Sequence, residues 1–341
     1  MWAMIVKEFR QLRRDRRTLA MMILMPVLLL VVLGYAASFD VSSVPAVVAG
    51  PGANALALPK PFTAVARDTA GGQDWARSQL RDGHAAVAFV TGDGATPHVL
   101  IDGSQLFTAQ AAERALAGTG DTAAAHATVL YNPDLKTSDI MIPGLSGVIL
   151  AFIGTVITSL GVVRERQSGT LEQLAVMPLK PADVFVGKLV PYFVVALADL
   201  ALVLIVGVTL FGVPFVGAPL VFGLGALLFV FTTLGIGVLI SSVSQNQGQA
   251  IQLAIMILLP QILLSGLIFP LSSMVAGVRW IAYILPISYF IDIARGVMLK
   301  GEPITALWAP FTFLTVIGAA VVLLATLRFR ALLAPHAGRA A

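Results

Sequence analysis

Long apolar runs alternate with short polar segments along this chain. Six of the runs have about 20 residues, the length that a helix needs to cross a bilayer. They cover residues 19–37, 140–163, 189–211, 219–240, 250–269 and 307–327. The pattern therefore predicts an α-helical polytopic membrane protein with six transmembrane helices.

The first 18 residues have a helical pattern of a different kind. Apolar residues recur at intervals of three and four positions on one helix face, and arginines occupy the other. The apolar residues are Trp2, Ile5, Val6 and Phe9, and the basic ones are Arg10, Arg13 and Arg14. This predicts an amphipathic interfacial helix at the membrane surface over residues 1–18.

Residues 1–37 also have the basic start, apolar middle and small-residue end of a signal peptide. Its removal would leave five spans and would put the remaining positively charged segments on conflicting sides. The pattern therefore favours a retained first helix at 19–37.

The segment 38–139 differs from the rest because it carries ten acidic and six basic residues among several Gly and Pro. Four strand-like runs (PAVVAG, HAAVAFV, HVLIDG and HATVLY) alternate with the helix-like stretches DWARSQLRDG and SQLFTAQAAERALAG. This alternation predicts a small α+β domain outside the membrane.

A second non-spanning segment, 270–306, is apolar but is interrupted by Pro270, Pro286 and Pro303. We expect short extracytoplasmic re-entrant helices here that dip partway into the outer leaflet. Such backbone is tolerated at membrane depth only where protein shields it.

Basic residues indicate the orientation of the spans, because short positively charged segments stay in the cytoplasm. They precede the first span, lie in 164–188 and follow the sixth span in 328–341. Both termini are therefore expected in the cytoplasm, and 38–139 outside. Arg279, Arg295 and Lys300 are a minority against this rule.

Composition supports the membrane class. The 341 residues have a mean hydropathy of +0.89 and 12% charged residues, against roughly 25% in soluble domains. The net charge of +4 does not indicate nucleic-acid binding, because six of the 22 basic residues lie in 7–17 beside an apolar run. The chain has no cysteine, which excludes disulfides and thiolate metal sites. Its four histidines lack ligand spacing, so no metal site is expected.

The linker 164–188, between the second and third spans, is the most polar short segment of the chain. Thr170 and Gln173 have capping-box spacing, and Pro178 and Pro181 suit the end of one helix and the start of the next. Burying one of its charges at mid-bilayer would cost ~2.5 to 3.5 kcal/mol. The linker is therefore expected in water or against another protein, as a short helix across the ends of the two spans.

Several motifs carry a family resemblance. The segment GVVRERQSGTLEQLAVMPLKPADVFVGKLVPY resembles the motif of type-2 ABC exporter permeases, roughly R-E-R-E-x-G-T-x-E-Q-L, then P-L-x-P and G-K-x-x-P-Y. YNPDLKTSDIMIPGL, QNQGQAIQL, LSGLIFP and ILPISYFIDIARGVMLKG are similar to further phrases of that family. The layout of six spans with a large insert after the first is similar too, so the resemblance covers most of residues 1–330. Departures include Gln167, where an acidic residue is usual, and the segments VVAGPGANALA and MVAGVRW.

The resemblance implies that ATP and Mg²⁺ are bound by a separate ABC ATPase subunit, and this chain has no G-x-x-x-x-G-K-[ST] loop to bind phosphates. It implies that the linker helix, together with the amphipathic N-terminal helix, docks on the ATPase. The residues carried over to this coupling region are Arg164, Glu165, Gly169, Thr170, Glu172, Gln173, Pro178, Lys180, Gly187 and Lys188.

By the same resemblance, two permease protomers would face two ATPase copies, most simply as a homodimer with two-fold symmetry. The function implied is export of a lipophilic or amphipathic compound, drug-like or lipid-like, across the bacterial inner membrane. Whether a periplasmic adaptor joins the complex stays open.

Three polar residues inside the spans are further candidates. Asp199 lies midway along the third span, where an ionisable group is costly and often functional. It could line the export path, act in a proton relay, or pair with a neighbouring helix. Gln252 and Gln261 suit hydrogen bonds between helices. Outside the spans, Asp292 and Arg295 are one helical turn apart and are expected to pair.

Two other function classes remain as alternatives. A proton-coupled secondary transporter would use Asp199, but the spans hold no second acid and no discernible inverted repeat. A membrane-anchored sensor would bind ligand through the outer domain, although six spans exceed what an anchor requires.

Overall fold

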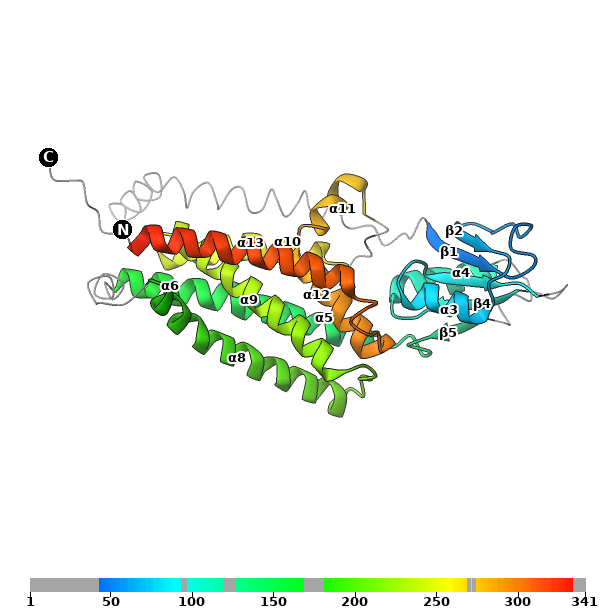
Figure 1. Ribbon diagram of the computed structural model, residues 1–341, viewed down its shortest axis with the longest axis horizontal. Coiled ribbons are helices and arrows are strands. Elements are labelled where there is room, and N and C mark those ends of the chain that lie inside the picture. The colour runs from blue at the N-terminus through cyan, green and yellow to red at the C-terminus, as the bar shows by residue number, and fades with distance from the viewer. Residues whose placement is uncertain are drawn as a thin grey trace, which may run out of the picture.

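The computed structural model describes residues 43–92, 97–118, 127–168, 181–268, 271 and 274–333. The predicted interfacial helix, the first predicted span and residues 169–180 of the polar linker lie outside these residues. The described chain forms a sheet domain at one end of an elongated helical bundle (Figure 1).

The sheet domain contains a five-stranded sheet with the order β2-β1-β3-β4-β5. Three neighbouring pairs are parallel, and β3 and β4 are antiparallel. The strands are β1 (Val44–Ala49), β2 (Phe62–Asp68), β3 (Val87–Val90), β4 (His98–Asp102) and β5 (Ala127–Leu130).

Two helices cover the two faces of this sheet. Leu80 of α3 (Gln73–Arg81) packs with Val47 of β1 on one face, and Ala112 of α4 (Leu106–Gly118) packs with Val48 on the other. Successive strand residues point to opposite faces, so a strand covered on both sides reads as a continuous apolar run. This is why PAVVAG and HAAVAFV stand out in the sequence.

The edge strand β2 is absent from the sequence-based expectation. Phe62 is its only buried residue, and its ring packs edge-on against Phe89 at 5.2 Å between centroids. A strand that buries one side chain shows no alternating pattern over its length. Its pairing with β1 therefore depends on the tertiary structure and leaves no pattern in the local sequence.

Five helical segments in the described chain are long and apolar enough to cross a membrane. The bundle helices are α5 (Thr137–Phe152), η2 (Ile153–Ile157), α6 (Thr158–Gln167), α8 (Pro181–Leu210), α9 (Pro219–Val243), α10 (Gln247–Leu264) and α13 (Trp308–Leu333). The first three form one continuous rod with a π-helical turn, η2, in its middle. The five segments coincide with the second to sixth predicted spans, although α8 begins inside the predicted linker and α13 extends into the predicted tail.

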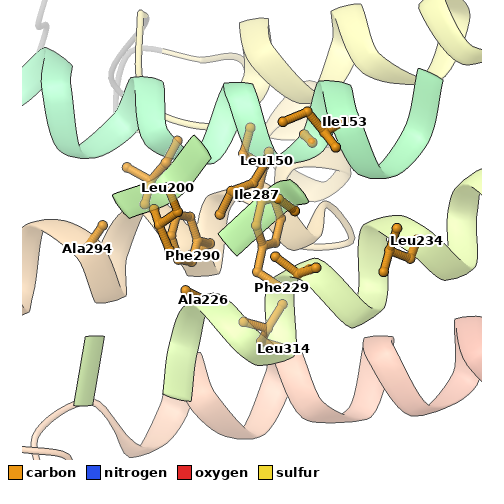
Figure 2. Packing of buried hydrophobic residues seen from close by; sticks show 14 of the residues in the cluster. Leu150, Ile153, Leu200, Ala226, Phe229, Leu234, Ile287, Phe290, Ala294 and Leu314 are labelled. Atoms are coloured by element: carbon orange, nitrogen blue, oxygen red, sulfur yellow. The ribbon is translucent and has the colours of Figure 1, made fainter. Parts of the chain in front are cut away.

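The segment 274–300 folds into α11 (Ala276–Ala282), α12 (Pro286–Arg295) and the π-helical turn η4 (Gly296–Lys300). Helix α12 packs against α5, α9 and α13. Its Phe290 ring stacks on Phe229 of α9, with centroids 4.7 Å apart and planes 8° from parallel. Figure 2 shows Ile287, Phe290 and Ala294 within the apolar cluster of the bundle. The neighbouring helices therefore shield this short helix.

Small residues allow the central rod and α9 to approach closely. A methyl group at Gly154 of η2 would overlap the side chain of Thr233, and one at Gly237 of α9 would overlap the carbonyl oxygen of Gly154. Close backbone approach through small residues is how helices gain packing energy in lipid, where no hydrophobic effect drives them together. The crossing thus depends on the absence of a Cβ at these positions.

Replacing Gly154 by Ala should therefore destabilise the bundle by about 1 to 3 kcal/mol, the usual cost of overpacking. The matched control is Gly223→Ala in α9, where an added Cβ would meet nothing within 4 Å. Unfolding of the purified protein in detergent, followed by circular dichroism, measures both. Equal stability of the two variants would show that the crossing tolerates a methyl group.

Candidate functional site

The rod α5–η2–α6 ends at the face of the bundle opposite the sheet domain (Figure 1). Val162 and Val163 are buried there, whereas Arg164 is exposed. The helix continues past this boundary, because Ser168 N–H donates to the Arg164 carbonyl at 3.0 Å. A packed helix thus carries an exposed polar end.

A neutral hydrogen bond connects this end to α10. Gln247 Nε2 donates to Gln167 Oε1 at 3.0 Å. At position 167, the family that this chain resembles usually has an acidic residue. Here the side-chain amide of Gln167 provides an uncharged oxygen that accepts the hydrogen bond from Gln247. Gln167, which departs from the family motif, therefore has a hydrogen-bond partner in Gln247.

The start of α10 is capped by side chains from both directions. The N-cap Asn246 accepts from Gln249 N–H at 2.9 Å, and Gln249 Oε1 accepts from Gln245 N–H at 3.0 Å. Reciprocal capping satisfies the free N–H groups at a helix start. The QNQGQ segment is therefore a rigid helix start next to the end of α6.

The predicted coupling residues divide into two groups in the structure. Arg164 and Glu165 lie in α6, and Gly187 and Lys188 lie in α8. Gly169, Thr170, Glu172, Gln173, Pro178 and Lys180 lie outside the described residues. The structure thus places the two helices that flank the linker, and both reach the same end of the bundle (Figure 1).

The polar candidates inside the spans lie on two helices. Asp199 is half-buried on α8 and makes no hydrogen bond or ion pair with any other described residue. On α10, the Oε1 atoms of Gln252 and Gln261 are buried without a hydrogen-bond partner. A buried amide oxygen without a partner is costly. These positions remain candidates for contacts with further protein or with cargo.

A second charged site lies where the sheet domain meets the bundle, and its centre is Lys300 at the end of η4. Its Nζ lies 2.9 Å from Asp102 Oδ2 and 3.8 Å from Glu302 Oε1. The Lys300 ammonium also donates to the Leu80 and Arg81 carbonyls at 3.1 and 3.3 Å. Lys300 therefore joins the bundle both to the sheet and to the C-terminal end of α3.

Local structure fixes both partners of this ion pair. Gly301, at φ 65°, ends η4 in the left-handed conformation that glycine adopts without strain. Asp102 Oδ1 accepts from Ser104 N–H at 2.9 Å, which orients Oδ2 towards Lys300. The side chains of Lys300 and Asp102 are 8% and 0% exposed, so this is a buried pair.

Burial and charge oppose each other in this cluster. Burial alone would lower the pKa of Lys300, but the carboxylates of Asp102 and Glu302 outweigh it, so the Lys300 pKa lies above its ordinary value. For Glu302, burial raises the pKa to about 7, and Lys300 offsets only part of the rise. Lys300 therefore stays charged, whereas Glu302 titrates near neutral pH.

Sequence reasoning missed this cluster, although one signal was present. Lys300 is among the three basic residues that run against the positive-inside pattern, and its buried partner Asp102 accounts for its position. Arg295 and Arg279 donate instead to the carbonyls of Gly266 and Met274. The expected ion pair between Asp292 and Arg295 is wrong, because no nitrogen–oxygen distance of 4 Å or less joins them.

No group of three or more metal-ligating side chains occurs among the residues that the structure describes. Asp102, which is buried, is paired with Lys300.

Five apolar helices that are long enough to cross a bilayer characterise an integral membrane protein. The model of the ABC-2 family transporter proteins matches residues 16–327, and the chain belongs to that family. It is therefore a permease of ABC-2 type.

Curated relatives from Escherichia coli K12 are similar to part of this chain. The "Probable multidrug ABC transporter permease YbhS" is 36% identical over 173 residues, which is 50% of this chain and 46% of the relative. YbhR, described in the same words, is 35% identical over 55% of this chain and 51% of its own length. The "Inner membrane transport permease YhhJ" is 33% identical over 204 residues, which is 59% of this chain and 54% of the relative.

The matched region thus spans about half the length of these curated relatives. No solved structure matches the chain.

Replacing Lys300 by Met should destabilise the protein by about 3 to 5 kcal/mol, because it leaves the Asp102 carboxylate buried without a counter-charge. Lys300→Met combined with Asp102→Asn should recover part of the loss. Lys136→Met is the control, since Lys136 pairs with Asp134 at 3.1 Å on the surface, where a pair contributes about 0 to 1 kcal/mol. Denaturant unfolding in detergent measures all three, and equal losses for Lys300→Met and Lys136→Met would contradict the role of the buried pair.

The raised pKa of Glu302 predicts a pH dependence of stability. The folded protein holds the Glu302 proton up to about pH 7, whereas the unfolded chain releases it near pH 4.5. Folding stability should therefore fall as pH rises from about 4.5 to about 7. Glu302→Gln should flatten this slope, as measured by unfolding at a series of pH values. Parallel pH profiles for the two proteins would be the contrary result.

Proposed function

We propose that this chain is the membrane subunit of an ATP-driven exporter, powered by a separate ABC ATPase that binds ATP and Mg²⁺. The observation that carries the proposal is the end of α6, where buried Val163 is followed directly by exposed Arg164. A partner that moves the exposed end would move a helix packed against α9 and α10. Rigid-body motion of packed helices is an established way to transmit such a change.

The ATPase would contact the linker between α6 and α8, at Arg164, Glu165, Gly169, Thr170, Glu172, Gln173, Pro178, Lys180, Gly187 and Lys188. The N-terminal residues Trp2, Ile5, Val6, Phe9, Arg10, Arg13 and Arg14 would form an adjoining surface helix. This contact places the linker and both termini in the cytoplasm of a bacterium, with the permease in its inner membrane.

The cargo that we propose is a lipophilic or amphipathic compound. Support comes from the relatives described as multidrug permeases. The outer helices support it as well, because only 17% of the apolar window of α8 and of α13 is buried in the chain. Apolar faces of that size fit lipid and a second protomer. Two permease protomers with two ATPase copies would complete the transporter.

A second candidate function rests on Asp199. Its carboxylate is half-buried in a spanning helix without a partner among the other described residues, as a proton-carrying group of a secondary transporter would be. Collapse of the proton gradient at constant ATP separates the two functions, because it would stop a proton-coupled carrier and leave an ATP-driven exporter working.

The coupling role predicts the effect of reversing one charge in the linker. Glu172→Lys should abolish stimulation of the partner ATPase and ATP-dependent uptake of a fluorescent lipophilic dye into inverted vesicles, because the contact would be lost. Membrane insertion should be unaffected. Glu113→Lys, at an exposed position of α4 in the sheet domain, is the control and should leave both activities intact. Unchanged ATPase stimulation and export in Glu172→Lys would refute the proposed contact.

A further inference from the structure

A cavity of about 690 Å³ lies at the junction of the sheet domain and the bundle. Its walls come from the segments that follow α3 and α10, the start of α4, the first turns of α5 and α13, the end of α12, and η4. This size is within the range of pockets that hold drug-sized molecules, roughly 300 to 1,000 Å³. The junction of the sheet domain and the bundle lies at the opposite end of the bundle from the end of α6 (Figure 1).

One part of the cavity wall is apolar. Its side chains come from four separate stretches of the chain and include Leu106, Ile140, Leu267, Leu271, Leu307 and Trp308. Leu106 and Ile140 belong to one small buried cluster with Leu299 of η4. A hydrocarbon chain or ring in contact with this wall would be removed from water, which is favourable by roughly 25 cal/mol per Å² of apolar surface.

The remaining wall carries charge, and Asp292 is its most available group. The Asp292 side chain is surrounded by protein atoms but is still accessible to solvent. It is accessible because it faces the cavity. No other described residue makes a hydrogen bond or ion pair with its carboxylate. It can therefore accept a ligand without first giving up a protein contact.

The charges around the cavity do not cancel. The two cations of the inner wall are Arg295 and Lys300, and Lys300 is already bound by Asp102 at 2.9 Å. Against them stand the carboxyl groups of the other charged lining residues, Asp82, Asp292 and Glu302. The surplus is acidic, and Glu302 Oε1 is only loosely held, at 3.8 Å from Lys300. A cationic ligand is therefore favoured over an anionic one.

We infer that this cavity binds a lipophilic amine, with its ammonium group at Asp292 and Glu302 and its hydrocarbon part along the leucines and Trp308. An ammonium group and a carboxylate form a charge-assisted hydrogen bond, which is roughly twice as strong as a neutral one. The apolar wall selects for an amphiphile over a small hydrophilic amine. The site goes beyond the proposed export function, because its occupation requires neither the ATPase nor nucleotide.

The charge preference can be measured with thiol reagents, because the chain contains no cysteine. Thr305→Cys places one thiol in an exposed position of the cavity wall, and Ala57→Cys places one on the surface of the sheet domain. Each purified variant, in lipid nanodiscs without ATPase, is treated with cationic 2-aminoethyl or anionic 2-sulfonatoethyl methanethiosulfonate. The ratio of cationic to anionic rates should be several-fold higher at residue 305 than at residue 57.

Substitutions then assign this preference to the proposed carboxyl groups. Asp292→Asn and Glu302→Gln, each in the Thr305→Cys background, should lower the rate ratio towards that of Ala57→Cys. Asp134→Asn removes the same charge from an exposed surface pair and should leave the ratio unchanged. A ratio insensitive to both cavity substitutions, or a preference for the anionic reagent, would overturn the assignment.

Protection by matched amphiphiles tests the ligand itself. Dodecylamine, dodecanol and dodecanoate are compared at the same mole fraction in the nanodisc lipid, with the uncharged 2-hydroxyethyl methanethiosulfonate as the reagent. Dodecylamine should slow modification of Thr305→Cys several-fold, dodecanol and dodecanoate should not, and Ala57→Cys should be unaffected by all three. Equal protection by the three, or none, would refute an amine site, whereas loss of export in a cell assay would bear only on the proposed function.

Discussion

The stacking of Phe290 on Phe229 supports much of the described architecture. It holds α12 against α9 in the apolar cluster of the bundle. Helix α12 continues directly into η4, and η4 ends at Lys300, which reaches the sheet domain. The sheet domain is thus connected to the bundle through a short helix that is fixed by aromatic packing. Aromatic pairs of this kind contribute about 0.5 to 1.5 kcal/mol beyond their buried area.

The rod α5–η2–α6 connects the two polar regions of the described chain. Ile140, near its start, lines the junction cavity, and Arg164, near its end, is exposed at the opposite face. Between them, η2 crosses α9 closely, because Gly154 has no side chain where it meets Thr233 and Gly237. π-helical turns within longer helices often occur at functional positions. A single helical path therefore runs from the cavity to the proposed ATPase contact.

The charges of this protein follow two different physical rules. In the sequence, most basic residues lie in segments expected on the cytoplasmic side, as the cost of translocating charge requires. In the structure, Lys300 is stabilised by a buried carboxylate and two carbonyl groups. Buried pairing removes the need for water around the ammonium group. These contacts therefore stabilise the charge of Lys300 in a segment that is expected on the outer side.

The sequence by itself determined the features that depend on neighbouring residues. Apolar runs of sufficient length located the five described spanning helices, and buried strand runs such as PAVVAG located β1, because periodicity and length act within one segment. The motifs around Arg164 also indicated the ABC-2 family that the comparisons establish. Only the tertiary structure decided the edge pairing of β2, the packing of α12 through Phe290 on Phe229, and the contacts of Lys300. Lys300 and Leu80 are 220 positions apart, and such a contact leaves no local pattern because its energy arises only when the folded chain brings both groups together.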